Sequence, residues 1–594
     1  MKQHLMTLAG VTLIFGVASC TQSTGPDEGS GTGGTSGAAG TTGTGGSTLT
    51  GAGGTSVTGG AGTGESAGGS TGTGGVTGSG GTSAGTGGGT SGGTSGSTGR
   101  GGTTGTAGTG MGGRGGGAGG MAGGAGATGT AGTNGAGGGG RGGGGAAGTG
   151  VAGTSGGGTT GAGGSQAGLP PGVTALFPPP GGQGICPDPP LRITFSGAPT
   201  LGNSGKVQVF NSSGTSVASV DMSATTVNDT IGGTAFILLN PVYVDGNSAV
   251  IYLKTKALSY GQTYYVTVDA GAIKPPGGGT LSITGTTAWR FTTAGAAPSS
   301  LSALSVALDG SGQFCTVQGA TDALPANNTA ASTITIKAGM YHEIMHVKSK
   351  SNITLHGLDR KQTIILGTNN NTQQGTNAST SNRPLLSFDT TNGLVIDNLT
   401  IHNLTPQGGS QAEALSLKAC DKCKITNADI LSLQDTLLWS GRVYADNCYI
   451  AGNVDYVWGT GVAYFNSCEI HTVGRSGVLV QSRNAAGAYG YVFVDSKLTA
   501  DSAATNNMLA RIDVSAYPGS HVAYINCQMT NIAAAGWTAT GGTPTSALRY
   551  WEYQSTDASG NALNVSGRMY GTQISASQAA MMRDPTVVLG GWQP

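Results

Sequence analysis

The sequence is poor in charged residues, and the charges it has cancel. Only 9% of its 594 residues are Asp, Glu, Lys or Arg, and 27 basic residues balance 27 acidic ones. A protein that binds nucleic acid by neutralising phosphates needs a basic patch or stripe. No Lys/Arg run is present, so we expect no nucleic-acid partner.

Cysteine and long apolar runs are also scarce. The chain has eight cysteines, of which only Cys420 and Cys423 are spaced as C-x-x-C, without the second pair that a zinc finger needs. An apolar run of about 13 residues, Leu5 to Val17, follows Lys2. It is too short to cross a bilayer as a helix, which takes about 20 residues, and is typical of an export signal.

Val17-Ala18-Ser19-Cys20 resembles the cleavage box of bacterial lipoproteins. The resemblance implies that residues 1–19 are a signal peptide and that Cys20 becomes the lipidated first residue. We therefore expect an exported bacterial lipoprotein that contacts a membrane through a lipid anchor, at the outer membrane or cell surface. An ordinary signal peptide with an unrelated cysteine is the alternative.

Glycine is abundant, and it is concentrated in one segment. By count, 69 of the 116 glycines lie between Thr21 and Gly168, in a Gly/Thr/Ser/Ala tract with almost no large apolar side chain. Ordering such a tract would cost conformational entropy that no buried surface offsets. Residues 20–168 are therefore predicted to be a disordered tether.

Alternating apolar and polar residues begin after a proline-rich boundary. Short runs such as "KVQVFN" and "TYYVTVDA" are separated by Gly, Asn and Ser turns, which predicts a small β-sandwich at 170–294. This segment resembles the Ig-like modules of bacterial surface proteins. A spacer is the plainer interpretation, and a carbohydrate-binding module is the alternative.

A different repeat occupies residues 298–594. Short β-branched runs, each next to Asn or Gly, align on Leu399, Cys423, Cys448, Cys468, Lys497 and Cys527, with steps of 24, 25, 20, 29 and 30 residues. Such steps are typical of a parallel β-solenoid, so the fold class is all-β. The aligned cysteines are expected to stack as small buried side chains. A disulfide between Cys448 and Cys468 is possible, because neighbouring rungs lie about 4.8 Å apart.

The segment His342-Glu343-Ile344-Met345-His346 spells H-E-x-x-H, which on a helix binds zinc. Here the flanking sequences are strand-like, and on an extended chain the two His Cα atoms lie about 13 Å apart. Zinc holds its nitrogen ligands at about 2.1 Å, so the pair is unusable. We expect neither a metal nor another cofactor.

Residues 301–594 resemble the pectin methylesterases, or pectinesterases. The resemblance is carried by motifs in the family's order: Gly339-x-Tyr341-x-Glu343, "QAEAL" at 411–415, "QDTLL" at 434–438, "DYVWG" at 455–459 and "LARID" at 509–513. It implies a right-handed parallel β-helix and a carboxylic ester hydrolase that removes methyl esters from pectin. The partner would be methylesterified pectin or a related uronate polysaccharide, and we expect a monomer.

The spacing of two aspartates indicates an ester hydrolase independently of the resemblance. Asp435 and Asp455 are 20 residues apart, about one coil, so a solenoid can stack the two carboxylates on neighbouring rungs. Two carboxylates that close cannot both ionise easily, so one keeps its proton near neutral pH while the other remains an anion. That division suits an ester hydrolase.

The resemblance assigns a role to each matching position. Asp455 would be the nucleophile, and Asp435 the acid that protonates the leaving alcohol and then the base that activates water. Gln411 and Gln434 would donate to the oxyanion, and Arg511 would hold Asp455 ionised. Five further residues are candidates for contact with substrate: Tyr341, Glu413, Tyr456, Trp458 and Trp537.

Two departures from the family pattern concern the substrate. Glu413 stands where the family usually has Val, and Ile512-Asp513 replaces Pro-Trp, which removes a ring expected to stack on sugar. We therefore expect a more negative groove. Two alternatives remain open: an esterase for another acyl ester or thioester, and a non-catalytic glycan-binding solenoid.

Overall fold

The computed structural model describes residues 168–594. The predicted signal peptide, the lipidation site at Cys20 and nearly all of the predicted tether lie outside the described residues. Within residues 168–594, no helix is both long enough and apolar enough to cross a membrane.

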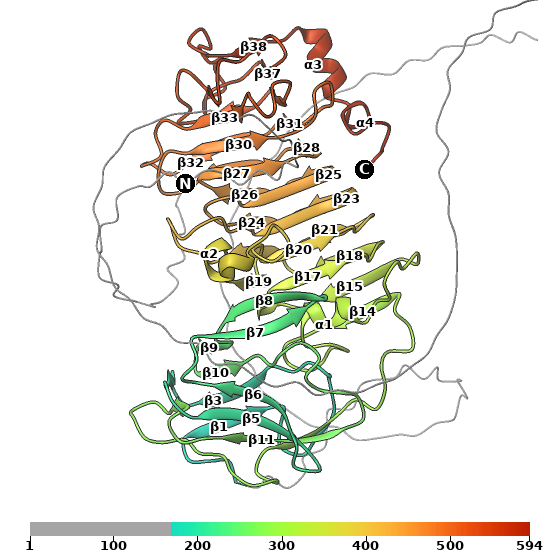
Figure 1. Ribbon diagram of the computed structural model, residues 1–594, viewed down its shortest axis with the longest axis vertical. Helices are drawn as coiled ribbons and strands as arrows, with labels where there is room; N and C mark the ends of the chain where they lie inside the picture. The colour runs from blue at the N-terminus through green and yellow to red at the C-terminus, as the bar shows by residue number, and fades with distance from the viewer. Residues whose placement is uncertain (1–167) are drawn as a thin grey trace, which may run out of the picture. The chain divides into compact units, whose positions relative to one another are not determined.

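The first module is a β-sandwich built from two sheets whose inner faces share one core (Figure 1). Its pairs are antiparallel, except that β13 pairs with β2 in parallel. The four-stranded sheet contains, in spatial order, β1 (Val173–Phe177), β3 (Leu191–Phe195), β10 (Ser248–Ile251) and β9 (Val242–Asp245). The five-stranded sheet contains β2 (Gly182–Ile185), β13 (Arg290–Thr293), β11 (Thr263–Val268), β5 (Lys206–Asn211) and β6 (Ser216–Asp221). Two small pairs complete the module: β4 (Thr200–Leu201) with β12 (Ile273–Lys274), and the hairpin β7 (Thr226–Ile231) with β8 (Thr234–Leu239).

The second module is a parallel β-helix, which confirms the predicted solenoid. Its coils contribute strands to three parallel sheets, named A, B and C here. Sheet A contains β14 (Ala303–Val306), β15 (Ser332–Ile336), β18 (Ile353–Gly357), β21 (Val395–Asp397), β28 (Val462–Asn466), β31 (Tyr491–Val494), β34 (His521–Ile525), β37 (Arg549–Tyr553) and β38 (Gly571–Gln573). Sheet B contains β17 (Met345–Lys348), β20 (Leu386–Asp389), β27 (Val454–Gly459), β30 (Val478–Ser482), β33 (Met508–Asp513) and β36 (Trp537–Thr540).

Sheet C precedes sheet B in each coil. It contains β16 (Gly339–His342), β19 (Thr363–Gly367), β22 (Thr400–Asn403), β24 (Asp429–Leu431), β26 (Tyr449–Gly452), β29 (Glu469–Thr472), β32 (Lys497–Ala500) and β35 (Gln528–Met529). The long strands β23 (Leu415–Thr426) and β25 (Leu437–Asp446) begin in sheet B and continue into sheet A. Figure 1 shows the coils stacked in chain order, from β14 to β38.

The turn between sheets A and C explains the repeated Asn in the sequence. One residue per coil adopts a left-handed backbone there, with φ between 48° and 59°, and Asn accepts this conformation more readily than most residues. These residues are Asn398, Asn427, Asn447, Ser467, Asp495 and Asn526.

The residue after this turn points into the core, and it corrects the predicted alignment. The strand register stacks Leu399, Ala428, Cys448, Cys468, Ser496 and Cys527. Cys423 pairs with Val443 instead, and Lys497 is one position late. The stacked cysteines are buried and free, so no Cys448–Cys468 disulfide is present. At these positions sulfur serves as a small apolar group.

Short helices cover parts of the β-helix. They are α1 (Val317–Asp322), α2 (Asn371–Gln374), the 3-10 turn Gly375–Asn377, α3 (Ala576–Met582) and α4 (Pro585–Val588). Apolar side chains of α3 and α4, among them Met582 and Val588, pack on the outer face of sheet A against Tyr464 and Val492. These helices thereby bury a sheet face that would otherwise meet water.

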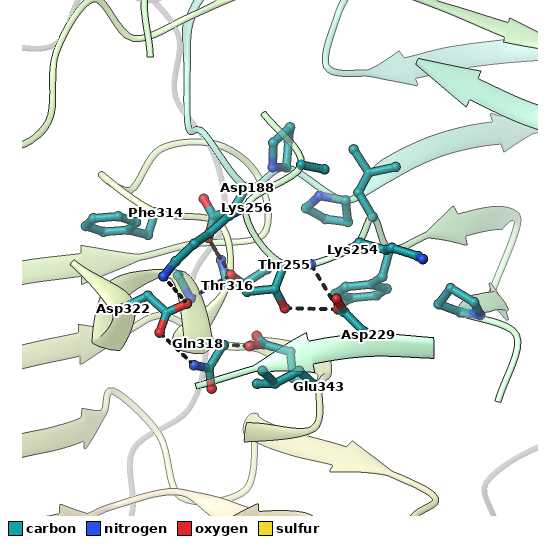
Figure 2. A pocket seen from close by; sticks show the side chains of 18 of the residues that line it. Asp188, Asp229, Lys254, Thr255, Lys256, Phe314, Thr316, Gln318, Asp322 and Glu343 are labelled. Carbon is teal, nitrogen blue, oxygen red and sulfur yellow. Dashed lines mark hydrogen bonds and ion pairs between the residues drawn. The ribbon is translucent and has the colours of Figure 1, made fainter. Parts of the chain in front are cut away.

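The contact between the two modules, called the junction here, is covalent as well as packed. Cys186 of the sandwich forms a disulfide with Cys315, which lies just before α1. Asp188 accepts hydrogen bonds from the backbone N–H groups of Cys315 and Thr316 at 3.0 and 2.9 Å. Glu343 accepts from the N–H group of Val317 at 2.9 Å and from that of Gln318 at 2.9 Å, and Figure 2 shows Gln318 beside Glu343. Two carboxylates therefore bind the start of α1.

The H-E-x-x-H segment belongs to this junction. It is extended, as predicted, with His342 ending β16 and His346 in β17. The His342 ring stacks on Tyr243 of the sandwich, with ring centroids 4.2 Å apart. His346 lies 3.3 Å from both Ile231 O and the Asp389 carboxylate. The segment is thus a docking surface for the sandwich.

A cavity of about 430 Å³ lies at the junction. Figure 2 shows Asp188, Asp322 and Glu343 around it, with Lys256 beside Asp322. No residue of the predicted catalytic set lines this cavity, since that set lies on later coils. This cavity is therefore separate from the predicted chemistry.

Candidate active site

Three carboxylates occupy equivalent positions on three successive coils. The register pairs Leu415 with Leu437 and Leu437 with Val457, which places Glu413, Asp435 and Asp455 one above another where each chain enters sheet B. Backbone bonds at this corner support the register, including the 3.0 Å bond from Asp435 N to Val454 O. Neighbouring parallel strands lie about 4.8 Å apart. We call these three residues the carboxylate column.

The backbone at this corner is unusual. Asp435 has φ 64° and Asp455 has φ 47°, both in the left-handed region. Most residues adopt this conformation at a cost, but Gly, Asn and Asp accept it more readily, and side chains there leave the regular in-and-out alternation of a strand. Asp435 is held by its backbone bond to Val454 O on the next coil, and Asp455 by its ion pair with Arg511. The corner therefore fixes where the two carboxylates lie.

Arg511 lies at one end of the carboxylate column. It extends from β33, and its Nη2 forms an ion pair with Oδ2 of Asp455. The Arg511 side chain is 34% exposed, whereas that of Asp455 is 6% exposed. A guanidinium at this position stabilises the carboxylate form of Asp455 and fixes its orientation.

Arg383 lies at the other end of the carboxylate column, and the sequence analysis did not identify it as a candidate. Its Nε is 3.0 Å from each oxygen of Glu413, and its Nη2 is 2.6 Å from Glu413 Oε1. The same Nη2 is 3.4 Å from Oδ2 of Asp435. Burial, together with the neighbouring charge of Glu413, raises the pKa of Asp435 well above its usual range.

The two glutamines lie beside the carboxylate column, in the same turns. Gln434 directly precedes Asp435 and forms a bridge with Val454, and its carbonyl accepts from Ala412 N at 3.1 Å. Gln411 precedes Ala412, and its Oε1 accepts from the Ser410 hydroxyl at 3.1 Å. Both residues are partly exposed.

Three residues predicted to contact substrate do not fit that role. Tyr341, Tyr456 and Trp537 are each 0% exposed and belong to the core of the β-helix. The Tyr341 hydroxyl donates to Lys337 O at 2.9 Å, and that of Tyr456 bonds Thr472 Oγ1 at 3.0 Å. Their rings therefore stabilise the coils and cannot reach a polymer on the surface.

Trp458 also differs from an open sugar platform. It is 7% exposed, and two guanidinium groups flank its ring: Arg383 at 5.6 Å and Arg483 at 4.7 Å from the ring centroid. Such cation–π contacts orient both arginines. Arg483, in the loop after β30, is a second residue that the sequence interpretation missed.

We expected both Glu413 and Asp513 to add negative charge to the groove, and this expectation is wrong for Glu413. Glu413 is 0% exposed and paired with Arg383, so it adds no free charge to a surface. Asp513 is partly exposed to solvent and accepts from Ser515 N at 3.0 Å. Its Ser515 contact lowers the pKa of Asp513, so it is an anion at neutral pH. Ile512 is buried in the core.

The two catalytic candidates have different neighbours: Asp435 is buried beside Glu413, and Asp455 is paired with Arg511. A buried carboxyl with a raised pKa can donate a proton, and a carboxylate paired with arginine can attack a carbonyl carbon.

One group of three His, Cys, Asp or Glu side chains lies within metal-binding distance in residues 168–594, and it is the only such group there. Its members are Cys186, Asp188 and Cys315. Two of its members are joined in the disulfide, so they offer no thiolate ligand.

Comparison with known proteins assigns each module to a family. The family model described as Pectinesterase matches residues 303–584, and that described as Bacterial Ig-like domain matches residues 168–293. Pectinesterase 31 of Arabidopsis thaliana is 34% identical over 33% of this chain and 64% of its own length. Probable pectinesterase A of Neosartorya fischeri is 31% identical over 48% of this chain and 85% of its own length.

Among solved structures, pectin methylesterase from carrot aligns with a TM-score of 0.44 and 29% identity, covering 48% of this chain and 93% of its own. The match to pectinesterase 1 of Citrus sinensis spans only 28% of that protein. The N. fischeri protein, in contrast, is matched over most of its length, and the family model spans the β-helix from its first strand to α3. The chain therefore belongs to the pectinesterase family.

Proposed function

We propose that the protein is a carboxylic ester hydrolase that removes methyl esters from homogalacturonan, giving pectate and methanol. The observation that carries the proposal is the register of Asp435 and Asp455 on adjacent coils, with Arg511 paired to Asp455. Membership of the pectinesterase family and the names of the matched relatives support the substrate class.

The carboxylate of Asp455 attacks the ester carbonyl carbon, and the carbonyl oxygen takes up the negative charge. Gln411 and Gln434 donate hydrogen bonds to this oxyanion, a contact often worth about 3 kcal/mol. As the bond to the methoxyl oxygen breaks, Asp435 gives that oxygen its proton and methanol leaves. An acyl-enzyme on Asp455 remains.

Asp435, now a carboxylate, takes a proton from water as the water oxygen attacks the acyl carbon. The bond between the acyl carbon and Asp455 breaks, and the polymer leaves as a carboxylic acid, which gives its proton to bulk water and becomes a carboxylate. Asp435 is protonated again and Asp455 is again an anion. The raised pKa of Asp435 fits this alternation, because burial and Glu413 both favour its protonated form between turnovers.

The test measures methanol release from highly methylated pectin and acetate release from an acetylated polymer in parallel. Methanol release that Asp455→Asn abolishes supports the proposal. Acetate release alone would replace it with the second candidate, an esterase for another acyl ester or thioester, which Asp513 in the place of an aromatic ring favours. Release of neither product, with binding of polymer retained, would indicate a glycan-binding solenoid.

We also propose that Cys20 is acylated and anchors the protein to a membrane, on the strength of the Val17-Ala18-Ser19-Cys20 box. The change Cys20→Ala is expected to move the protein to the soluble fraction without altering kcat. Mass spectrometry of the mature N-terminus provides the decisive measurement. Membrane retention without an acyl chain would refute the anchor.

A further inference from the structure

Arg383 contacts both of the first two members of the carboxylate column, Glu413 and Asp435. Its guanidinium binds Glu413 through three short contacts and reaches Asp435 at 3.4 Å. The Glu413 side chain is 0% exposed and that of Arg383 12% exposed, so the pair lies in a medium that screens charge poorly. A charge at either position therefore acts strongly on Asp435.

The loop that carries Arg383 is fixed on both sides of that residue. The Asn369 side-chain amide donates to Asn382 O at 2.9 Å and to Pro384 O at 2.7 Å. Its oxygen accepts from Gln374 Nε2 at 2.7 Å. Asn369 thereby holds the backbone carbonyls immediately before and after Arg383.

The sandwich module holds the same loop. Ile237 of β8 donates its N–H to Gln374 Oε1 at 2.9 Å and accepts from Gln374 Nε2 at 2.8 Å. Asn382 Nδ2 reaches Ala235 O of the same strand at 3.4 Å. In Figure 1 the hairpin β7–β8 lies beside the early coils near α2, and these bonds make that contact specific. A continuous path of hydrogen bonds joins the Ig-like sandwich to the carboxylate column.

We propose that Arg383 is a positioning residue for Asp435, that Glu413 balances its charge so that Asp435 keeps its proton, and that the hairpin β7–β8 fixes the Arg383 loop. The inference rests on the proposed esterase function for the role of Asp435. It makes the sandwich part of the active-site support and assigns Glu413 a role inside the protein, away from substrate.

The charges that face Asp435 come from four elements. They are Glu413 before β23, Arg383 in the 371–385 loop, Asp455 in β27 and Arg483 after β30. Arg383 and Arg483 favour the carboxylate of Asp435, whereas Glu413 and Asp455 favour the protonated form. Removing the charge of Glu413 while keeping Arg383 therefore shifts the balance toward the carboxylate.

The first variant is Glu413→Gln, and the readout is the pH profile of kcat/KM for methanol release. Because Asp435 acts as a protonated acid, activity falls as pH rises through its pKa. The variant is expected to move this alkaline limb to lower pH and to reduce kcat/KM on the limb roughly tenfold, the effect of one nearby charge. The double variant Arg383→Met with Glu413→Gln removes both charges and is expected to return the limb toward its wild-type position.

The matched control is Glu552→Gln, which breaks another buried Arg–Glu pair. Glu552 lies on β37 and is 0% exposed. Its carboxylate oxygens are 3.0 Å from Arg568 Nε and 3.2 Å from Arg568 Nη2. This variant is expected to lower the melting temperature as Glu413→Gln does, without moving the pH limb. Gln374→Met, which breaks the contact with Ile237, is expected to lower kcat a few-fold with KM unchanged.

A second readout does not require turnover. Infrared difference spectra, with Asp435→Asn as the reference, follow the Asp435 carboxyl as pH is varied. A shift of this titration to lower pH in Glu413→Gln supports the inference, even if the wild type releases no methanol and the proposed function fails. Methanol release by the wild type with neither the limb nor the titration moved would overturn the inference alone.

Discussion

The molecule contains two groups of buried carboxylates, and their partners differ. At the junction, Asp188 and Glu343 accept hydrogen bonds from backbone N–H groups at the start of α1. In the carboxylate column, Glu413 and Asp455 face arginine side chains instead. Burial raises the pKa of Glu343 to about 8, and burial also raises the pKa of Asp435 well above its usual range. A raised pKa alone therefore does not distinguish a structural carboxylate from a catalytic one.

The partners make the distinction. A carboxylate whose two oxygens each accept from a backbone N–H group holds the fold, and its removal leaves those donors unsatisfied. The column instead stacks acids in register beside arginine side chains, so the charge of one group acts on the protonation of the next. The predictions below test this contrast.

The largest expected effect is on the column. Asp455→Asn and Asp435→Asn are each expected to lower kcat by roughly 10³-fold or more, because nucleophile and acid–base functions are lost. Asn accepts the left-handed backbone that both positions require, so the fold is expected to remain. Methanol assays and circular-dichroism melts check both statements. Retention of about a tenth of wild-type activity in either variant would contradict the assigned roles.

The next effect is on stability, at the junction. Glu343→Gln is expected to cost about 1–3 kcal/mol, because the amide nitrogen that replaces one carboxyl oxygen cannot accept the N–H bond that this oxygen accepts at the start of α1. In the folded state the pKa of Glu343 lies near 8, above its unfolded value. Its contribution to stability is therefore complete below the unfolded pKa and is lost as pH rises through about 8.

Thermal melts between pH 6 and pH 9 test this sign. The melting temperature of the wild type is expected to fall more over this interval than that of Glu343→Gln, while kcat/KM of the variant at neutral pH stays near the wild-type value. Equal slopes in the two proteins would show that Glu343 does not titrate in this range. A large loss of kcat would place Glu343 in the active site after all.

A smaller effect is expected at the edge of the groove. Asp513→Trp introduces a ring where the family motif has one and removes a partly exposed anion. A stacking contact contributes about 1 kcal/mol, so KM for pectin is expected to fall roughly fivefold with kcat nearly unchanged. Steady-state kinetics on highly methylated pectin give both constants. A loss of kcat at constant KM would mean that the sugar lies elsewhere.

The sequence predicted the solenoid well, because each coil repeats the same local signals. Asn at the left-handed turn and an apolar residue after it recur along the chain, and strand type follows from β-branched runs. The register was predicted less well: Cys423 was placed in the stack where Ala428 belongs, because coil lengths vary and the sequence alone does not show where each strand begins.

The candidate site was predictable where motifs carry it and not elsewhere. Asp435, Asp455 and Arg511 lie in ordered motifs, whereas Arg383 stands alone in "SNRPLL" with no pattern around it. Its role depends on a contact across coils that only the fold brings together. Tyr341, Tyr456 and Trp537 show the converse, since an aromatic residue beside a motif is as often part of the core as of a sugar platform.

The smallest expected effect concerns the H-E-x-x-H segment, where we predict that EDTA leaves kcat/KM unchanged. His342 stacks on Tyr243, Glu343 is bound to the start of α1, and His346 contacts Ile231 O and Asp389. All three side chains are committed to the junction and none to the carboxylate column. His342→Phe keeps the stacking ring but loses any ligand nitrogen, so it is expected to match the wild type in activity with and without chelator. Activity lost in EDTA and restored by zinc, together with an inactive His342→Phe, would move the chemistry from the column to the junction.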